Sequence, residues 1–135
     1  MTSENLIQEA ESLGITVNRF PLPLNGSCSV SLNNSLFIGI DNRRAVESLQ
    51  RVRIAHELGH CVNDAFYLPH APIRSRRKCE RIANEYAIQK LIPEDDFFEA
   101  IKKGDTEPWQ IAERFDVTPE FAYKAMKYYH DRGMQ

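Results

Sequence analysis

Residues 56–60 read His-Glu-Leu-Gly-His, and residues 80–87 read Glu-Arg-Ile-Ala-Asn-Glu-Tyr-Ala. The first stretch has the pattern His-Glu-x-x-His and lies in a segment, about residues 45–66, whose apolar residues recur at helical spacing. Four residues advance a helix by about 400°, so both imidazoles project from one face, about 6 Å apart along the axis. We therefore predict that His56 and His60 bind one metal ion, and zinc suits nitrogen ligands at this spacing.

Glu57 lies beside the first histidine and is predicted to be the general base. It is too close in sequence to His56 to share the ion comfortably, but it can reach a water molecule that the metal activates. A carboxylate in that place takes the proton as the water attacks a carbonyl group. A histidine pair at this spacing can also be structural, and the helical context favours the metal site over that alternative.

A third ligand is expected because catalytic zinc usually has three protein ligands and one open position. Glu80 lies on a second predicted helix, about residues 76–91, and is the predicted ligand, with Glu85 as its competitor. Asn84, one turn after Glu80, can accept a hydrogen bond from the second nitrogen of a ligand histidine. Asp64, one turn after His60, is a second candidate for such a supporting contact.

The surrounding sequence predicts an α+β fold with a small N-terminal β-sheet followed by several helices. Alternating residues predict a hairpin over residues 27–40, with Asn33 and Asn34 in its turn because asparagine tolerates positive φ. The other predicted elements are a helix over about 3–13, a strand over 15–17, and helices over about 93–103, 108–115 and 119–132.

The length of 135 residues fits a single domain. Within it we distinguish the N-terminal helix and hairpin (1–43), the metal-binding helices (44–92) and a C-terminal helical segment (105–135). Hydrophobic residues make up 42% of the chain and charged residues 27%, which is ordinary for a globular domain.

Charge, apolar runs and cysteines bear on partners and location. Residues 43–81 contain nine basic and four acidic residues, a difference of +5, which predicts a positive face able to attract an acidic partner. The sequence has no run of about 20 apolar residues and no basic N-terminal region followed by an apolar one. Its three cysteines form no Cys-x-x-Cys pair. We therefore expect a cytoplasmic protein without a membrane span.

Residues 111–122 resemble a helix-turn-helix, so a DNA-binding or regulatory module with a structural metal is the rival function. From Asp105 onward, however, the chain has six acidic and four basic residues, which offers little attraction to phosphate. Glu120 also lies at the N-terminal end of the helix that would contact bases. The charge therefore argues against DNA binding and favours two helices that pack on the rest of the protein.

Two features stay open at this stage. A donor opposite the base should stabilise the transition state, and His70 and Tyr86 are candidates together with Tyr67 and His130. Gly59 costs about 1 kcal/mol in a helix interior, which either a closely approaching element or simple tolerance explains.

The two quoted stretches, followed by Leu91-Ile92-Pro93, together resemble the ImmA/IrrE family of metallopeptidases from about Ile15 to the end of the chain. The resemblance implies a zincin-like (gluzincin) fold, one zinc ion held by His56, His60 and Glu80, and Glu57 as base. In a zincin-like arrangement the return strand, residues 35–40, would form a sheet edge above the zinc, to which an extended peptide can add; the alternative is an ordinary core strand. Family members that resemble this chain cleave helix-turn-helix repressors, releasing phage or mobile-element genes, or act in stress responses. The resemblance thus implies a zinc endopeptidase with a protein substrate, a repressor being the first candidate. Tyr86 departs from the family's commoner Phe.

Overall fold

The computed structural model describes residues 1–22, 26–41, 43 and 45–133, and its elements follow an α+β order. They are α1 (Ser3–Ser12), β1 (Thr16–Phe20), β2 (Ser27–Leu32), β3 (Ser35–Asp41), α2 (Glu47–Val62), α3 (Ile73–Leu91), α4 (Glu94–Lys102), α5 (Pro108–Phe115) and α6 (Pro119–Gly133). A small sheet and then helices confirm the predicted mixed composition. Residues 23–25, 42, 44, 134 and 135 belong to the three segments expected from the sequence (1–43, 44–92 and 105–135) and lie outside the described residues.

The three strands form one sheet in the order β1-β3-β2. The predicted hairpin is confirmed: β2 runs antiparallel to β3, and both turn residues have positive φ, 51° at Asn33 and 66° at Asn34. Strand β1 pairs in parallel with the other side of β3, with Thr16 opposite Phe37. The expectation that residues 35–40 form the sheet edge is therefore wrong. The edge strands are β1 and β2, because β3 pairs with both of them. The pairing of β1 with β3 joins distant parts of the chain and leaves no local sequence signal.

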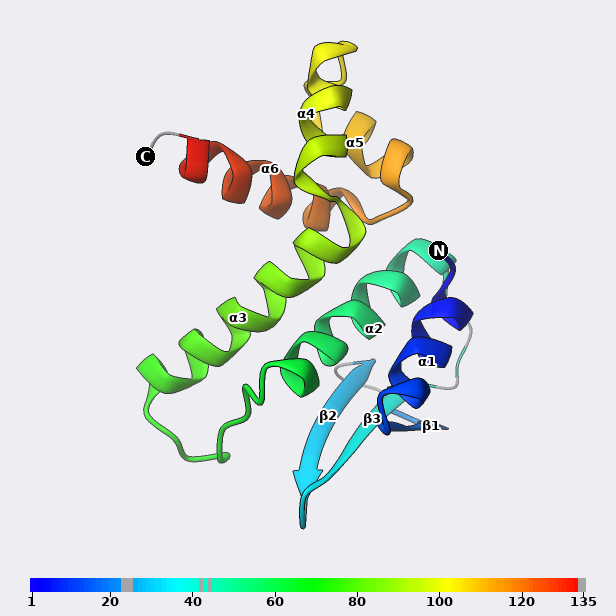
Figure 1. Ribbon diagram of the computed structural model, residues 1–135, viewed down its shortest axis with the longest axis vertical. Coiled ribbons are helices and arrows are strands. Elements are labelled where there is room, and N and C mark those ends of the chain that lie inside the picture. The colour runs from blue at the N-terminus through cyan, green and yellow to red at the C-terminus, as the bar shows by residue number, and fades with distance from the viewer. Residues whose placement is uncertain (23–25, 42, 44, 134–135) are drawn as a thin grey trace.

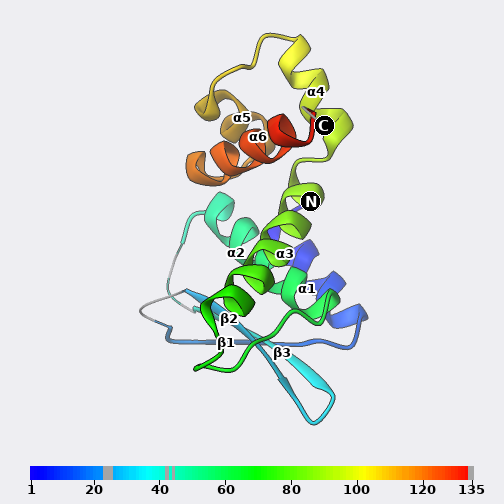
Figure 2. The ribbon, with the colours of Figure 1, turned by 90° about the vertical axis from the view of Figure 1, so that its left-hand side faces the viewer.

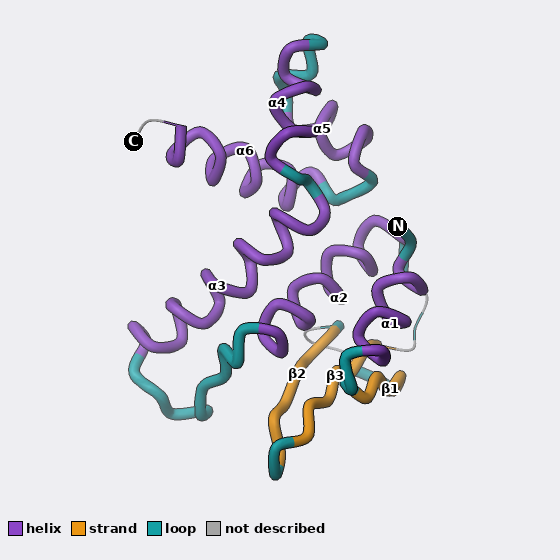
Figure 3. Tube along the Cα trace, viewed as in Figure 1, coloured by secondary structure: helices purple, strands orange, loops and turns teal. Residues whose placement is uncertain are grey.

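Helices α1 and α2 pack on this sheet, and α3 lies alongside α2 (Figures 1 and 2). Ile38 and Ile40 of the sheet and Ile54 and Leu58 of α2 are almost completely buried and belong to the core. Helix α2 ends at Val62, earlier than predicted, because Asp64 adopts a left-handed φ of 50°. The chain then follows a loop to the start of α3, as the teal segment in Figure 3 shows.

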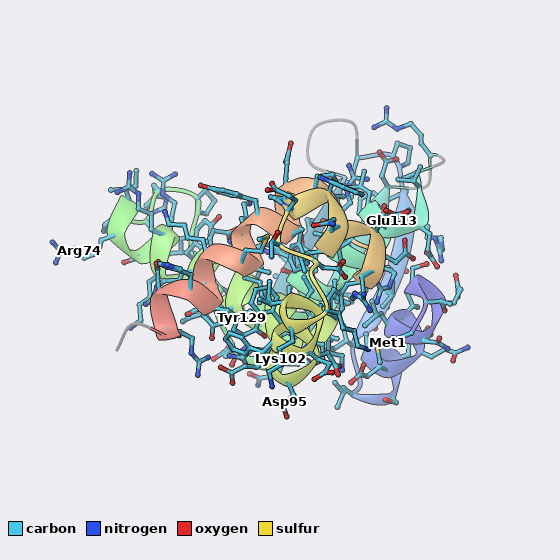
Figure 4. All side chains as sticks on the ribbon, turned by 90° about the horizontal axis from the view of Figure 1, so that it is seen from above. Met1, Arg74, Asp95, Lys102, Glu113 and Tyr129 are labelled. Atoms are coloured by element: carbon cyan, nitrogen blue, oxygen red, sulfur yellow. The ribbon has the colours of Figure 1, made fainter. Side chains whose placement is uncertain are left out.

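Helices α4, α5 and α6 gather at the far end of α3 (Figures 1 and 2). Tyr129 of α6 is buried, stacks on Phe97 of α4 with ring centroids 4.9 Å apart, and donates a hydrogen bond to the Ile92 carbonyl at 2.5 Å. Figure 4 shows Tyr129 between α6 and α4. None of the described helices has both the length and the apolar character needed to cross a membrane.

A buried arginine joins this helical cluster to α2. The guanidinium Nη1 of Arg51, a residue only 7% exposed, donates to the carbonyl oxygens of Phe115 and Asp116 at 2.6 Å each. Its Nε donates to the Met1 carbonyl at 2.8 Å. Asp116 ends α5 with a left-handed φ of 54°, so the arginine binds the carbonyl groups left free at the helix end. The α5–α6 turn is thereby fixed against α2.

Candidate metal centre

The centre begins with the close approach of α2 and α3, which Gly59 permits. A Cβ atom added at Gly59 would lie 2.8 Å from the carbonyl oxygen of Ala83 and 3.0 Å from its Cα. Ala83 and Ala87, on the facing side of α3, are completely buried. Of the two explanations for Gly59 left open by the sequence, the structure supports close approach. This contact between α2 and α3, which we call the seam, brings the middle of α3 within reach of the histidines on α2.

Three side chains meet at this seam. Nε2 of His56 lies 3.2 Å from Nε2 of His60 and 3.1 Å from Oε1 of Glu80. Nε2 of His60 lies 2.9 Å from Oε2 of Glu80. His56, His60 and Glu80 form a group whose ligand atoms all lie within 4.8 Å of one another. Glu85, the competing candidate, forms an ion pair with Arg81 at 3.6 Å instead.

The second nitrogens of both imidazoles face hydrogen-bond acceptors. Nδ1 of His60 lies 2.6 Å from the Ala65 carbonyl oxygen, which can only accept, so this nitrogen donates. Nδ1 of His56 lies 2.8 Å from Oδ1 of Asn84, the contact expected from sequence. Asp64, the other expected partner, is exposed beyond the helix end, and the carbonyl group of the next residue takes its place.

This arrangement fits a metal ion. With Nδ1 carrying the proton, a neutral imidazole presents its Nε2 lone pair, so two nitrogen lone pairs and one carboxylate converge on one point. Three such acceptors repel one another unless positive charge lies between them. Ligands about 2.0–2.1 Å from a tetrahedral zinc ion are about 3.3–3.4 Å apart, within a few tenths of an ångström of the separations found here. The three residues can therefore hold a cation of this size.

Glu57 is buried beside the cluster, and two serines of β2 bind its carboxylate. Ser27 Oγ donates to Oε2 at 2.7 Å, and Ser29 Oγ donates to Oε1 at 2.8 Å. Sequence reasoning did not assign a role to these serines. The available signal was their alternation, because residues 27 and 29 share one face of a strand.

Two cysteines near the site lie outside the group of candidate ligands found among the described residues. Burial, and secondarily the charge of Glu57, raises the pKa of the Cys61 thiol to about 11. The same two causes raise the pKa of Cys28. Without a metal both groups are therefore thiols at neutral pH.

The cluster opens into a cleft of about 880 Å³ whose walls come from β2, α2, the loop after α2, α3 and the start of α6. Tyr67 lines this cleft, and burial together with the neighbouring Glu80 carboxylate raises its pKa. The other candidate donors lie elsewhere. His70 and His130 are exposed outside the cleft lining, and Tyr86 packs against the back of α2 beside Gly59.

Helix α6 is the helix that would contact bases in the rival DNA-binding function, and its N-terminal end faces the same cleft. Glu120, Phe121 and Lys124 of α6 line it, and Arg51 holds the preceding turn against α2. The start of α6 therefore forms part of the cleft wall.

Comparison with known proteins gives one family match. Residues 10–127 match the model of peptidase family M78, described as the IrrE N-terminal-like domain. No curated protein matches the chain. The matched region contains the whole cluster, its supporting residues and both serines, and this family supports a metallopeptidase role for the chain.

Proposed function

Because the chain belongs to peptidase family M78, we propose that it is a zinc-dependent endopeptidase that cleaves an intracellular protein. The observation that carries the proposal is the convergence of His56, His60 and Glu80, whose acceptor atoms face one another at 2.9–3.2 Å. Two imidazoles and one carboxylate are a ligand set typical of catalytic zinc in peptidases. We assign one zinc ion per chain to these three residues.

Each residue near the metal cluster has a defined role in the proposed reaction. When bound, the ion supplies the positive charge that polarises a peptide carbonyl and lowers the pKa of a water molecule. Glu57 lines the same cleft and accepts the proton of the attacking water, then passes it to the leaving amine. Ser27 and Ser29 hold both of its oxygens, so the carboxylate is fixed before substrate arrives. Asn84 and the Ala65 carbonyl keep the imidazole Nε2 atoms directed at the ion.

Tyr67 is the candidate for stabilising the transition state. It lines the cleft near Glu80, and its raised pKa keeps the phenol protonated at neutral pH. A neutral phenol can donate a hydrogen bond to the oxygen on which negative charge develops. This assignment replaces His70 and Tyr86, which lie outside the cleft lining.

Strand β2 offers the surface for the peptide backbone. It is one of the two edge strands of the sheet, and its residues Ser27 to Ser29 line the cleft. An extended peptide that adds to this edge is held by main-chain hydrogen bonds and needs no free terminus, which favours internal cleavage. The resemblance to ImmA/IrrE proteins supports a helix-turn-helix transcriptional repressor as the substrate.

The test is a Glu57→Gln variant compared with wild type and with Glu113→Gln, a matched change on the exposed face of α5. All three proteins should bind about one zinc ion per chain by elemental analysis. Cleavage of a proteome-derived peptide library, and of a repressor co-expressed with the protein, should fall at least about 100-fold in Glu57→Gln only. Full cleavage by that variant would refute the assignment of the base.

A further inference from the structure

A second groove, of about 690 Å³, runs between α3 and α6 and opens beside the metal cluster. It shares four lining residues with the main cleft: Tyr67, Glu80, Asn84 and Lys124. The groove therefore continues the space in which a substrate would lie, on the side of α3 that faces α6. Figure 1 shows these two helices diverging from the point where α6 begins.

Basic side chains predominate along this groove. Its lining includes five basic residues, namely Arg76, Arg77, Arg81, Lys124 and Lys127. The acidic residues that line it are Glu80, Glu85 and Asp131. Glu80 belongs to the metal cluster, and Glu85 is paired with Arg81. The remaining groups are four cations and one carboxylate, and within the described part of the chain none of those four cations has an ion-pair partner within 4.0 Å.

Arg76 adds an independent observation. Its Nε atom is buried and has no hydrogen-bond partner among the described residues. Buried donors are normally satisfied, and the unpaired N–H of this groove-lining arginine would be satisfied by an acceptor on a ligand bound there. A guanidinium favours the paired oxygens of a carboxylate, to which it can donate two parallel hydrogen bonds.

We propose that this groove binds acidic side chains of the protein substrate, so that the enzyme prefers Asp or Glu on one side of the cleaved bond. The inference rests on the proposed peptidase function and names a substrate class for that site. The apolar groups Ile73, Ile88 and Tyr128 also line the groove, which suits a peptide better than a run of phosphates.

The first test measures binding without catalysis. A zinc-loaded Glu57→Gln protein is titrated with two fluorescein-labelled peptides that are identical except that one has Glu where the other has Gln. At about 0.15 M salt the Glu peptide should bind at least about tenfold more tightly, and the preference should shrink as salt increases. Equal affinity for the two peptides would overturn the proposal.

Two charge-reversal variants separate the groove from general charge. Arg77→Glu with Lys127→Glu changes two exposed groove residues, and Arg74→Glu with Lys78→Glu makes the same change of net charge on α3 outside the groove lining. Figure 4 shows Arg74 projecting away from the protein at the N-terminal end of α3. The first pair should remove the preference for Glu, and the second should keep most of it. Equal losses in both pairs, or tighter binding of a single-stranded oligonucleotide than of the Glu peptide, would contradict the groove assignment.

A cleavage profile connects the groove to the enzyme. Wild-type protein acting on a proteome-derived peptide library should show acidic residues enriched on one side of its cleavage sites, and the Arg77→Glu, Lys127→Glu variant should cut with that enrichment lost. Cleavage without enrichment in wild type would refute the inference and leave the peptidase function standing. Binding of the Glu peptide together with no cleavage of any peptide would instead count against the peptidase function alone.

Discussion

Replacing Gly59 by alanine places a methyl group in the seam between α2 and α3. The new Cβ would lie 2.8 Å from the Ala83 carbonyl oxygen and 3.0 Å from both the Ala83 Cα and the Tyr86 Cβ. Backbone atoms cannot swing aside, so the helices must separate by about 0.6 Å to reach an ordinary contact distance near 3.4 Å. The strain acts on the element that supplies Glu80 and Asn84.

The expected stability change combines two opposing contributions. Alanine favours a helix over glycine by about 1 kcal/mol, whereas overpacking a tight seam costs about 1–3 kcal/mol. The free energy of unfolding should therefore fall by up to about 2 kcal/mol. Metal affinity should fall too, because ligand distances tolerate errors of only about 0.2 Å and the separation is about three times larger. We expect zinc to bind at least about tenfold more weakly.

Two measurements keep these effects apart. Urea unfolding in the presence of a chelator should show a midpoint lower by up to about 1 M in the metal-free variant. Competition with a chromophoric chelator then gives the zinc affinity of the folded protein. Gly133→Ala is the control, because a Cβ there meets nothing within 4 Å. If Gly59→Ala matches the control in both stability and zinc affinity, the seam does not position the ligands as argued.

Two further substitutions test the groups that support the centre. Asn84→Ala removes the acceptor of His56 Nδ1 and should weaken zinc binding about 10–100-fold in a chelator competition, whereas the exposed Gln89→Ala on the same helix should leave it unchanged. Ser27→Ala leaves a buried Glu57 oxygen with one donor fewer and should lower the free energy of unfolding by about 1–3 kcal/mol in urea titrations; an equal loss in the exposed Ser31→Ala would show that the Glu57 contact is not the cause.

The sequence predicted those parts of the site that depend on local spacing. His56 and His60 share a helix, and Glu80 and Asn84 share another, so one periodicity argument placed each pair on one face. The hairpin followed in the same way from the two asparagines of its turn, both of which have positive φ in the structure. What joins the two helices is not local: the sequence leaves Gly59 open between a closely approaching element and simple tolerance, and the structure shows the close approach, at Ala83.

The parts that could not be predicted depend on loop geometry and distant pairing. Asp64 was expected to face His60 because the predicted helix extended to about residue 66. Helix α2 ends at Val62 instead, and the main-chain carbonyl of Ala65 accepts the hydrogen bond from His60. A carbonyl group belongs to every residue, so no residue type marks it in the sequence. Tyr67 is in the same loop, and its place at the cleft depends on how that loop turns. The contact of the two β2 serines with Glu57 depends on the order of the strands in the sheet. That order includes the pairing of β1 with β3, which joins distant parts of the chain.

Packing and electrostatics act against each other at the centre, and this opposition predicts a link between metal and fold. The apolar seam draws α2 and α3 together, while the approach directs three acceptors of His56, His60 and Glu80 at one another. Neither Nδ1 can relieve the repulsion by exchanging its proton, because Asn84 and the Ala65 carbonyl already accept from those atoms. A cation bound between them would satisfy all three acceptors with the helices in contact, so metal binding should stabilise the helix pair.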